Sequence, residues 1–362
     1  MSKAFDTGAD SGMGEAAMPS AGHVRAPVED VQQAIYACLQ KEGLSDDHTR
    51  LVGNTILQAE VDGTASHGLL RLPGYLSSMR CGWVNTRPRP IIIDAAPGLL
   101  DVNADNGFAQ ISLAASQEAL IEKARRQGVA ALAMRHSHHF ASLYPDIETF
   151  AAQGLLALTF VNTRSLVVAA PGARKILGTN PMAFACPRPG LPPMIWDQAS
   201  SLFSRGDTLI HAKAGTPLPP GVGVDAKGHP TRDAQAVLEG GAFLTFGGYK
   251  GFSIAMMVEI LAAALTGAPF GFEDESGTHP GAHTTRGGQT VILLDPSALP
   301  NSRFFERVES FFSELCSQEN TRLPGDRRYA SRARAQREGL LLAEAAYLQL
   351  KQLAADAGHA MP

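Results

Sequence analysis

The chain is poor in cysteine, has little net charge and lacks any long apolar run. Its 362 residues include four cysteines, and none of them forms a CxxC pair or a dense framework. This spacing disfavours a zinc ribbon and a secreted disulfide scaffold, so we expect reduced thiols in a cytoplasmic protein. The net charge of -4 leaves no positive field to gather nucleic acid or anionic lipid. No apolar run reaches the roughly 20 residues of a spanning helix, so we expect no membrane partner.

What is present is the composition of a folded, globular chain. Hydrophobic residues make up 44% and charged residues 18%, which excludes a largely disordered or collagen-like polymer. The length is sufficient for two or three compact units, since a domain usually takes roughly 100–200 residues. Residues 1–24 have no apolar core after Lys3, so we predict a disordered tail there, with neither export nor membrane insertion.

Helical patterns follow the tail. Two amphipathic helices are predicted between residues 27 and 62, and Ser45 is the predicted N-cap of the second. A third helical stripe runs from residue 69 to residue 79 and is interrupted by Pro73 and Gly74. The N-terminal part of the chain is therefore predicted to be helical.

Beyond residue 90, strand and helix patterns alternate. Strands are predicted at 91–95, 99–103, 129–134, 155–161, 182–186, 194–197 and 290–295, and helices at 109–127, 254–265, 304–316 and 335–353. This alternation predicts an α/β fold. We assign a discontinuous helical domain to residues 25–90 with 296–355, and an α/β region that includes the cofactor-binding domain to residues 91–295.

No ordinary dinucleotide-binding turn is present. One formal match to the glycine-rich signature, Gly12 with Gly14 and Ala17, lies in the predicted tail. The other, around Gly221 and Gly223, leads into further turn residues instead of a helix. Because the signature requires a strand before it and a helix after it, we reject both. A nicotinamide cofactor, if one is used, is not held on a Rossmann turn.

The dipeptide Ser66-His67 is the first candidate for proton chemistry. It lies at a predicted junction between helices, and small neighbours such as Gly63 and Gly68 allow a substrate to approach the backbone. A bare Ser-His pair is more often a capped turn, and an isolated arginine is usually a surface residue. Arg71 stands four residues after His67 and could hold a carboxylate with its bidentate fork. The combination is a stronger signal than either part.

The remaining histidine-rich segments do not predict a metal site. His136, His138 and His139 follow a predicted strand, with no carboxylate or thiolate at a supporting spacing. Phosphate or ring contacts are the favoured role for them. His279 and His283 are separated by Pro280, so they cannot share a helix face and are predicted to lie in a loop.

Three further positions carry polar groups in predicted loops. Thr179 precedes a strand and either contacts a ligand or belongs to an Asx-type turn. Asp207 is interpreted as a residue that orients a histidine. The predicted turn at 325–329 contains two adjacent arginines, which suit a phosphate, although arginines in loops are most often solvated.

Five ordered segments together resemble the malate/L-lactate dehydrogenase-type oxidoreductases, a family unrelated to the Rossmann dehydrogenases. They are DGTASHGLLRLPGYL, RHSHHFASLYPD, LGTNPMAF, GGYKGFSIAMMVEILAAALTG and LPGDRR, and the match covers about residues 28–353. Within that family the chain is most similar to reductases of Δ1-piperideine-2-carboxylate and Δ1-pyrroline-2-carboxylate, through LPPGVGVD, LEGGAFLTFGGYKG and HPGAHT.

This resemblance implies a non-Rossmann NAD(P)-binding fold with a helical substrate and dimerisation part. It implies reduction of a cyclic imino acid to L-pipecolate or L-proline by a homodimer, with NADPH as cofactor and NADH as the alternative. Its catalytic set falls on Ser66, His67 and Asp207, with His67 as the proton donor. Arg71 and Thr179 match its substrate-binding positions. Its cofactor contacts fall on His139, Phe140, Ala141, Ser142, Leu143, Asp197, Gln198, Ala199, Arg205, Gly206, Gly248, Gly325, Asp326, Arg327, Arg328 and Tyr329.

The chain also departs from the imine reductases at a few positions. It reads DQASS at 197–201 where they tend to have DLATS, RGD at 205–207 where they tend to have HGD, and Thr-Arg-Ser at 163–165. Arg205 either favours the 2′-phosphate of NADPH or pairs with Asp207, and we prefer the first interpretation. Two other functions stay open: a 2-hydroxy acid dehydrogenase acting on malate, lactate or ureidoglycolate, and a catalytically silent binding protein.

Overall fold

The structure is a computed structural model that describes residues 22–168 and 174–361. Residues 1–21 of the predicted tail lie outside the described residues. Its last part is not a tail, because His23 and Val24 belong to strand β1 (His23–Ala26), which pairs antiparallel with β14 (Leu340–Ala343). The backbone hydrogen bonds of this two-stranded sheet join the two ends of the described chain.

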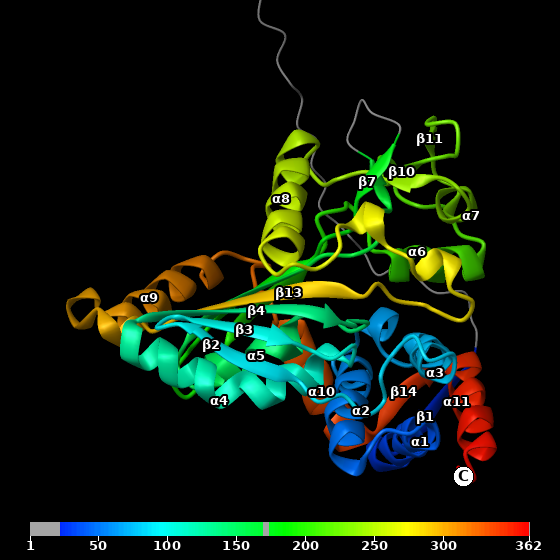
Figure 1. The fold of residues 1–362 in the computed structure, drawn as a ribbon, viewed down its shortest axis with the longest axis horizontal. Helices are drawn as coiled ribbons and strands as arrows, with labels where there is room; N and C mark the ends of the chain where they lie inside the picture. The colour runs from blue at the N-terminus through cyan, green and yellow to red at the C-terminus, as the bar shows by residue number, and fades with distance from the viewer. Residues whose placement is uncertain (1–21, 169–173, 362) are drawn as a thin grey trace, which may run out of the picture.

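A seven-stranded sheet crosses the centre of the molecule (Figure 1). Its order is β2 (Ile91–Ala96), β3 (Leu99–Asn103), β4 (Val129–Ser137), β13 (Gly287–Leu294), β5 (Leu156–Val161), β8 (Met182–Cys186) and β9 (Met194–Gln198). Only β3 and β4 pair in parallel, and the other neighbours are antiparallel. The α/β fold class that the sequence predicts is confirmed.

Helices cover both faces of this sheet. On β5, Ala157 and Val161 pack with helices α4 (Ala109–Gln127) and α5 (Tyr144–Ala152). Leu158 and Phe160 point to the opposite face and pack with the helix that begins as α8 (Tyr249–Glu259). This alternation is the period of two that any strand imposes on its side chains. Figure 1 shows α8 standing above the sheet and α4 lying below it.

The helical unit consists of α1 (Val28–Lys41), α2 (Asp46–Val61), α3 (Leu72–Arg80) and α11 (Glu344–Asp356). These helices share one apolar core, and α1 contacts α11. Ser45 caps α2 as predicted, since its hydroxyl accepts a hydrogen bond from the amide of His48 at 3.3 Å. Helix α9 (Phe304–Cys316) lies elsewhere: its Phe312 packs beside Cys186 of the sheet, although residues 296–355 were grouped with the first helices.

Two helix predictions are wrong. The single helix expected at 335–353 is broken, because α10 (Asp326–Glu338) ends at Gly339, whose φ of 80° and ψ of 172° take the backbone out of the helical conformation and are readily adopted only by glycine. The turn expected at 325–329 is in fact the first turn of α10, with Gly325 alone outside it. The two adjacent arginines therefore stand on a helix.

Two other helices also differ from the prediction. Pro73 does not interrupt α3 but lies in its first turn, where a missing amide hydrogen costs nothing. Two 3-10 turns, Ala65–His67 and Leu69–Arg71, precede it. Helix α8 starts at residue 249, before the predicted residue 254, and continues as π-helix over Ile260–Ala264.

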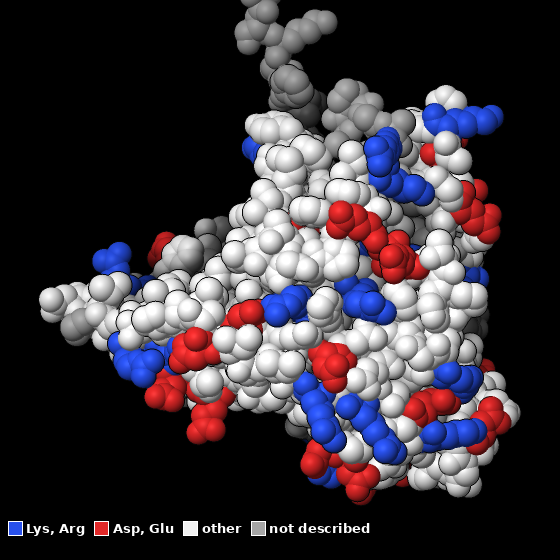
Figure 2. All heavy atoms as spheres, in the orientation of Figure 1, with Lys and Arg blue, Asp and Glu red and all other residues white. Residues whose placement is uncertain are grey.

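A smaller sheet lies beside the large one. Its order is β11 (Pro230–Thr231), β10 (Gly223–Val224), β12 (Ala242–Phe243), β6 (Val167–Val168) and β7 (Lys175–Leu177). Helices α6 (Arg205–Ala214) and α7 (Ala234–Leu238) pack against each other beside it. Figure 2 shows acidic and basic side chains interspersed over one face of the molecule. Within the described residues no helix is long and apolar enough to span a membrane.

Candidate active site

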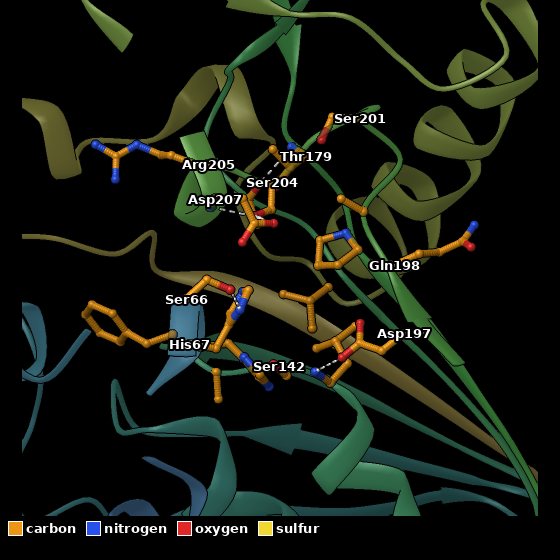
Figure 3. Close-up of a pocket in the computed structure, with 18 of the residues that line it drawn as sticks. Ser66, His67, Ser142, Thr179, Asp197, Gln198, Ser201, Ser204, Arg205 and Asp207 are labelled. Atoms are coloured by element: carbon orange, nitrogen blue, oxygen red, sulfur yellow. Dashed lines mark hydrogen bonds between the residues drawn. The ribbon is translucent and has the colours of Figure 1, made fainter. Parts of the chain in front are cut away.

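A cavity of about 910 Å³ lies between the helical unit, the large sheet and the small sheet. Its volume is at the upper end of the roughly 300–1,000 Å³ of ligand pockets. Figure 3 shows Ser66 and His67 on one side of it, α6 with Arg205 and Asp207 opposite, and Asp197 at the end of β9. The predicted site residues in its wall are Ser66, His67, Arg71, His139, Phe140, Ala141, Ser142, Leu143, Thr179, Asp197, Gln198, Ala199, Arg205, Asp207, Arg327 and Arg328.

Five predicted site residues do not line the cavity. Gly206 stands behind the wall, where a Cβ would come within 2.9 Å of Arg71 and 3.0 Å of Ser66, so α6 can approach only because this residue is glycine. Gly248 is exposed at the start of α8 and does not line the cavity, although Phe246 two residues earlier does. Gly325, Asp326 and Tyr329 support the start of α10 from outside the wall; the Tyr329 hydroxyl, for example, donates to the Pro193 carbonyl at 2.8 Å.

Ser66, His67 and Arg71 form one hydrogen-bonded group on the two 3-10 turns. The Ser66 hydroxyl lies 3.0 Å from Nδ1 of His67, and Nε of Arg71 donates to the Ser66 carbonyl at 2.9 Å. Burial, together with the charges of the nearby Arg71 and His139, lowers the pKa of His67 to about 3. In the absence of an anion His67 is therefore neutral near pH 7, with Nδ1 engaged by Ser66.

Glu60 contacts the second of these 3-10 turns through the Leu69 amide, and sequence analysis did not predict its role. Its Oε1 accepts a hydrogen bond from the Leu69 amide at 2.6 Å, and a Cβ on Gly68 would lie 2.2 Å from the same oxygen. Burial raises the pKa of Glu60 to about 7, and the hydrogen bond from Leu69 opposes that shift. The signal available in the sequence was an acidic residue near the end of a helix, which by itself does not indicate this contact.

His139 belongs to a second buried group that the sequence analysis missed. Its Nε2 lies 2.7 Å from Oδ2 of Asp146, and the side chains are only 5% and 2% exposed. Gln289 of β13 donates to the same carboxylate at 2.9 Å. The loop before α5 brings Asp146 back to His139. His136 and His138 instead contact Asn103 and Asn106, and within the described residues no three His, Cys, Asp or Glu side chains form a metal-binding group.

Asp207 lies across the cavity from Ser66 and His67 (Figure 3). Its carboxylate accepts a hydrogen bond from the Ser204 hydroxyl at 2.7 Å, and Ser204 in turn caps α6 by accepting from the Asp207 amide at 3.0 Å. Among the described residues, Asp207 forms no hydrogen bond with a histidine, so the prediction that it orients one has no support from a direct contact. Its charge does oppose the lowering of the Arg71 pKa that burial causes.

Thr179 stands in the wall beside Thr163, with the two hydroxyls 3.3 Å apart. The Thr179 amide donates to the Thr163 hydroxyl at 2.9 Å. The next residue, Asn180, is buried and donates to Glu259 at 2.6 Å. The segment is therefore a rigid corner held by long-range contacts and not a local Asx-type turn.

The opposite end of the cavity is built around Asp197. Its Oδ2 accepts hydrogen bonds from the amides of Leu143 and Tyr144 at 2.6 and 3.0 Å. Burial raises the pKa of Asp197, and these amides oppose that shift. Arg328 donates to the Ile195 carbonyl at 2.5 Å and lies over the Tyr144 ring at 4.4 Å, so its guanidinium is held in place.

A buried ion-pair network joins this end to the helical unit. Arg332 of α10 donates to Asp62 at 2.9 Å and to Glu148 at 2.9 Å. The side chain of Asp62 is fully buried and also accepts from the Tyr144 hydroxyl at 2.7 Å. Sequence reasoning gave no signal for this network, because Arg332 and Asp62 are 270 residues apart.

Comparison with known proteins agrees with the resemblance seen in the sequence. The profile of the malate/L-lactate dehydrogenase family matches residues 26–351. The chain is 44% identical over 330 residues to a Delta(1)-pyrroline-2-carboxylate/Delta(1)-piperideine-2-carboxylate reductase of Pseudomonas putida, covering 91% of this chain and 97% of that protein. It is 36% identical over 327 residues to a (2R)-3-sulfolactate dehydrogenase (NADP(+)) of Chromohalobacter salexigens, covering 90% and 97%.

A solved structure supports the same relationship. The delta1-piperideine-2-carboxylate reductase from Pseudomonas syringae pathovar tomato superposes with a TM-score of 0.88 at 43% identity, covering 91% of this chain and 99% of that chain. The chain, with its seven-stranded sheet and the cavity between its units, belongs to the malate/L-lactate dehydrogenase family.

Proposed function

We propose that the chain is an NADPH-dependent reductase of cyclic 2-imino acids, which converts Δ1-piperideine-2-carboxylate to L-pipecolate and Δ1-pyrroline-2-carboxylate to L-proline. One observation carries the proposal: Ser66, His67 and Arg71 face one cavity in a chain that is 44% identical to a reductase of these substrates. A carboxylate-binding arginine beside an acid-base histidine is the pair of groups that such a reaction requires.

The Asp197 end of the cavity fits a nicotinamide dinucleotide. Arg327 and Arg328 line it and offer positive charge to phosphates, and Ser142 adds a hydroxyl to the same wall. Arg327 has no ion-pair partner among the described residues, so its charge is available to a ligand. When bound, the cofactor supplies the hydride that C2 of the substrate receives. NADH is the alternative to NADPH.

The residues of the chain then bind and protonate the substrate. Arg71 holds the 2-carboxylate and so orients the C=N bond, which lowers the entropic part of the barrier. Nδ1 of His67 is engaged by Ser66, which leaves Nε2 to give its proton to the ring nitrogen. Neutralisation of Arg71 by the carboxylate removes one cause of the low His67 pKa, so binding favours the protonated donor. Ser66 and Asp207 are proposed to form a relay that positions His67 and returns a proton to it after each turnover.

Steady-state assays test this function against the alternative. NADPH and NADH are each offered with the two cyclic imines, with pyruvate and with oxaloacetate. We expect the highest kcat/KM for a cyclic imine with NADPH. Negligible turnover of both imines, together with efficient turnover of a 2-oxo acid, would refute the proposal and favour a 2-hydroxy acid dehydrogenase. The absence of all turnover would favour a binding protein.

We also propose that the chain acts in the cytoplasm as a homodimer, with the helix that begins as α8 in its interface. Tyr249, Met256, Met257 and Ile260 on this helix are exposed, at 76%, 41%, 40% and 59%. Such a stripe of large apolar side chains is typical of a protein interface. Light scattering on the wild type and on the Ile260→Lys variant tests this assembly; a monomeric wild type would contradict it.

A further inference from the structure

The cavity wall carries positive charge at both of its ends. Among the described residues it contains five arginines and two aspartates. Arg327 and Arg328 belong to the Asp197 end. The other three arginines, Arg71, Arg164 and Arg205, belong to the end that holds Ser66, His67 and Asp207.

Helix α6 brings Arg205 close to Arg71. Arg205 begins this helix, and the next residue, Gly206, lies so close to Arg71 that a Cβ there would come within 2.9 Å of its Nη2. The charges of Arg71 and Arg164 add to burial in lowering the pKa of Arg205 to about 10. Arg205 is therefore a neighbour of the group proposed to hold the 2-carboxylate.

Arg164 reaches the same end from the opposite wall. Its backbone amide donates to the Thr285 hydroxyl at 3.0 Å, and it directly follows Thr163, which contacts Thr179. Arg164 also contributes to the lowered pKa of Arg71. Its backbone position is therefore determined on both sides by residues of the cavity wall.

The three arginines are only partly balanced. Asp207 is the one carboxylate at this end within the described wall, and it faces Arg71. The guanidinium groups of Arg164 and Arg205 form no ion pair and no hydrogen bond with a described residue. One substrate carboxylate on Arg71 therefore leaves a positive excess. Clustered, partly desolvated cations of this kind are costly unless an anion joins them.

The direction of Arg205 bears on which anion that is. Figure 3 shows its side chain extending away from Asp197 and Gln198, and also away from Ser66, His67 and Asp207. The 2′-phosphate interpretation of Arg205 requires the phosphate to lie near Arg205, whereas Arg327 and Arg328 already provide cations at the Asp197 end. Because Arg205 neighbours Arg71, which is proposed to hold the 2-carboxylate, an anionic group of the substrate is the better match.

We propose that Arg164 and Arg205 form a second anion subsite, which binds a further carboxylate on the substrate at the side of the ring away from the 2-carboxylate. The inference rests on the proposed function: the favoured substrate is then a cyclic 2-imino dicarboxylate. Arg71 binds the 2-carboxylate, and Arg164 and Arg205 bind the second carboxylate. The hydride and the proton are transferred as in the monocarboxylate reaction.

Binding of two planar analogues tests the subsite. The full-length protein with saturating NADPH is titrated by calorimetry with pyrrole-2-carboxylate and with pyrrole-2,5-dicarboxylate. We expect the dicarboxylate to bind about tenfold more tightly or better, since a charge-assisted hydrogen bond is worth ~1.5–3 kcal/mol and ~1.4 kcal/mol is tenfold in Kd. Arg164→Gln should lower this preference by about tenfold, and Arg164→Lys should keep part of it.

Arg126→Gln is the matched control, because Arg126 lies on α4 with a side chain that is 56% exposed; it should leave the preference unchanged. Equal binding of the two analogues by the wild type overturns the proposal. Weaker NADPH binding by Arg164→Gln, with the dicarboxylate preference intact, also overturns it, because Arg164 would then serve the cofactor. A dicarboxylate preference in an enzyme that reduces no imine would support the subsite and refute the proposed function.

Discussion

Replacement of Glu60 by glutamine should make the protein more stable in alkaline solution and leave it unchanged in acid. Glu60 is buried under the turn that carries His67, and its pKa is raised from the ordinary 4.5 to about 7. The folded protein therefore binds this proton more tightly than the unfolded chain does. The resulting stability is fully present below about pH 4.5 and is lost as the pH rises through about 7.

The magnitude follows from the two pKa values. The difference between 4.5 and about 7, at ~1.36 kcal/mol per pH unit, corresponds to about 3 kcal/mol of stability lost by pH 8. Glutamine keeps an oxygen that can accept the Leu69 amide but carries no ionisable proton. The Glu60→Gln variant should therefore exceed the wild type by up to about 3 kcal/mol at pH 8 and match it near pH 4, below the unfolded pKa of 4.5.

The tryptophans of the chain provide a local assay. Trp83 is buried in the core of the helical unit that contains Glu60's helix, and Trp196 is the only other tryptophan. Urea unfolding followed by Trp83 fluorescence in a Trp196→Phe background reports on this unit. The exposed Glu118 offers a control, since Glu118→Gln should not change the pH dependence. A Glu60→Gln effect of equal size at pH 4 and pH 8 would refute the reasoning.

Three further predictions concern the cavity and its support. His67→Gln should lower kcat by about 10²- to 10⁴-fold with little change in NADPH affinity; turnover and fluorescence titration measure the two effects, and unchanged kcat would exclude His67 as the donor. Binding of pyrrole-2-carboxylate near pH 6 should take up protons, because neutralising Arg71 raises the pKa of His67 from about 3; calorimetry in two buffers of different ionisation enthalpy detects this uptake, and proton release would contradict it. Arg332→Met should destabilise the protein by about 3–5 kcal/mol, because it removes a partner of the buried Asp62; urea unfolding tests this, and the double variant with Asp62→Asn should recover part of the loss.

Local features of the sequence predicted much of the fold. The strands of the large sheet and helices α1, α2, α4 and α9 were predicted to within a few residues, because their apolar periods are set by backbone geometry alone. The break at Gly339 was missed, because glycine ends a helix only where its neighbours require a positive φ. The order and the mainly antiparallel pairing of the sheet were not predicted either.

The candidate site likewise has one part that the sequence predicts and another that it does not. Ser66, His67 and Arg71 lie within six residues, so their proximity follows from the chain itself. Three features depend on how loops and helices return to the cavity: Glu60 under Leu69, Asp146 beside His139, and the presence of Arg164 and Arg205 in one cavity wall.

The sequence by itself determined the fold class, the family resemblance and the Ser66-His67 pair, because periodicity and adjacent motifs are written in the order of residues. Only the tertiary structure decided which charges meet. Arg332 reaches Asp62 across 270 residues, and the three arginines at the substrate end come from separate elements. Electrostatic energy depends on distance and burial in space, and neither quantity can be obtained from positions along the chain.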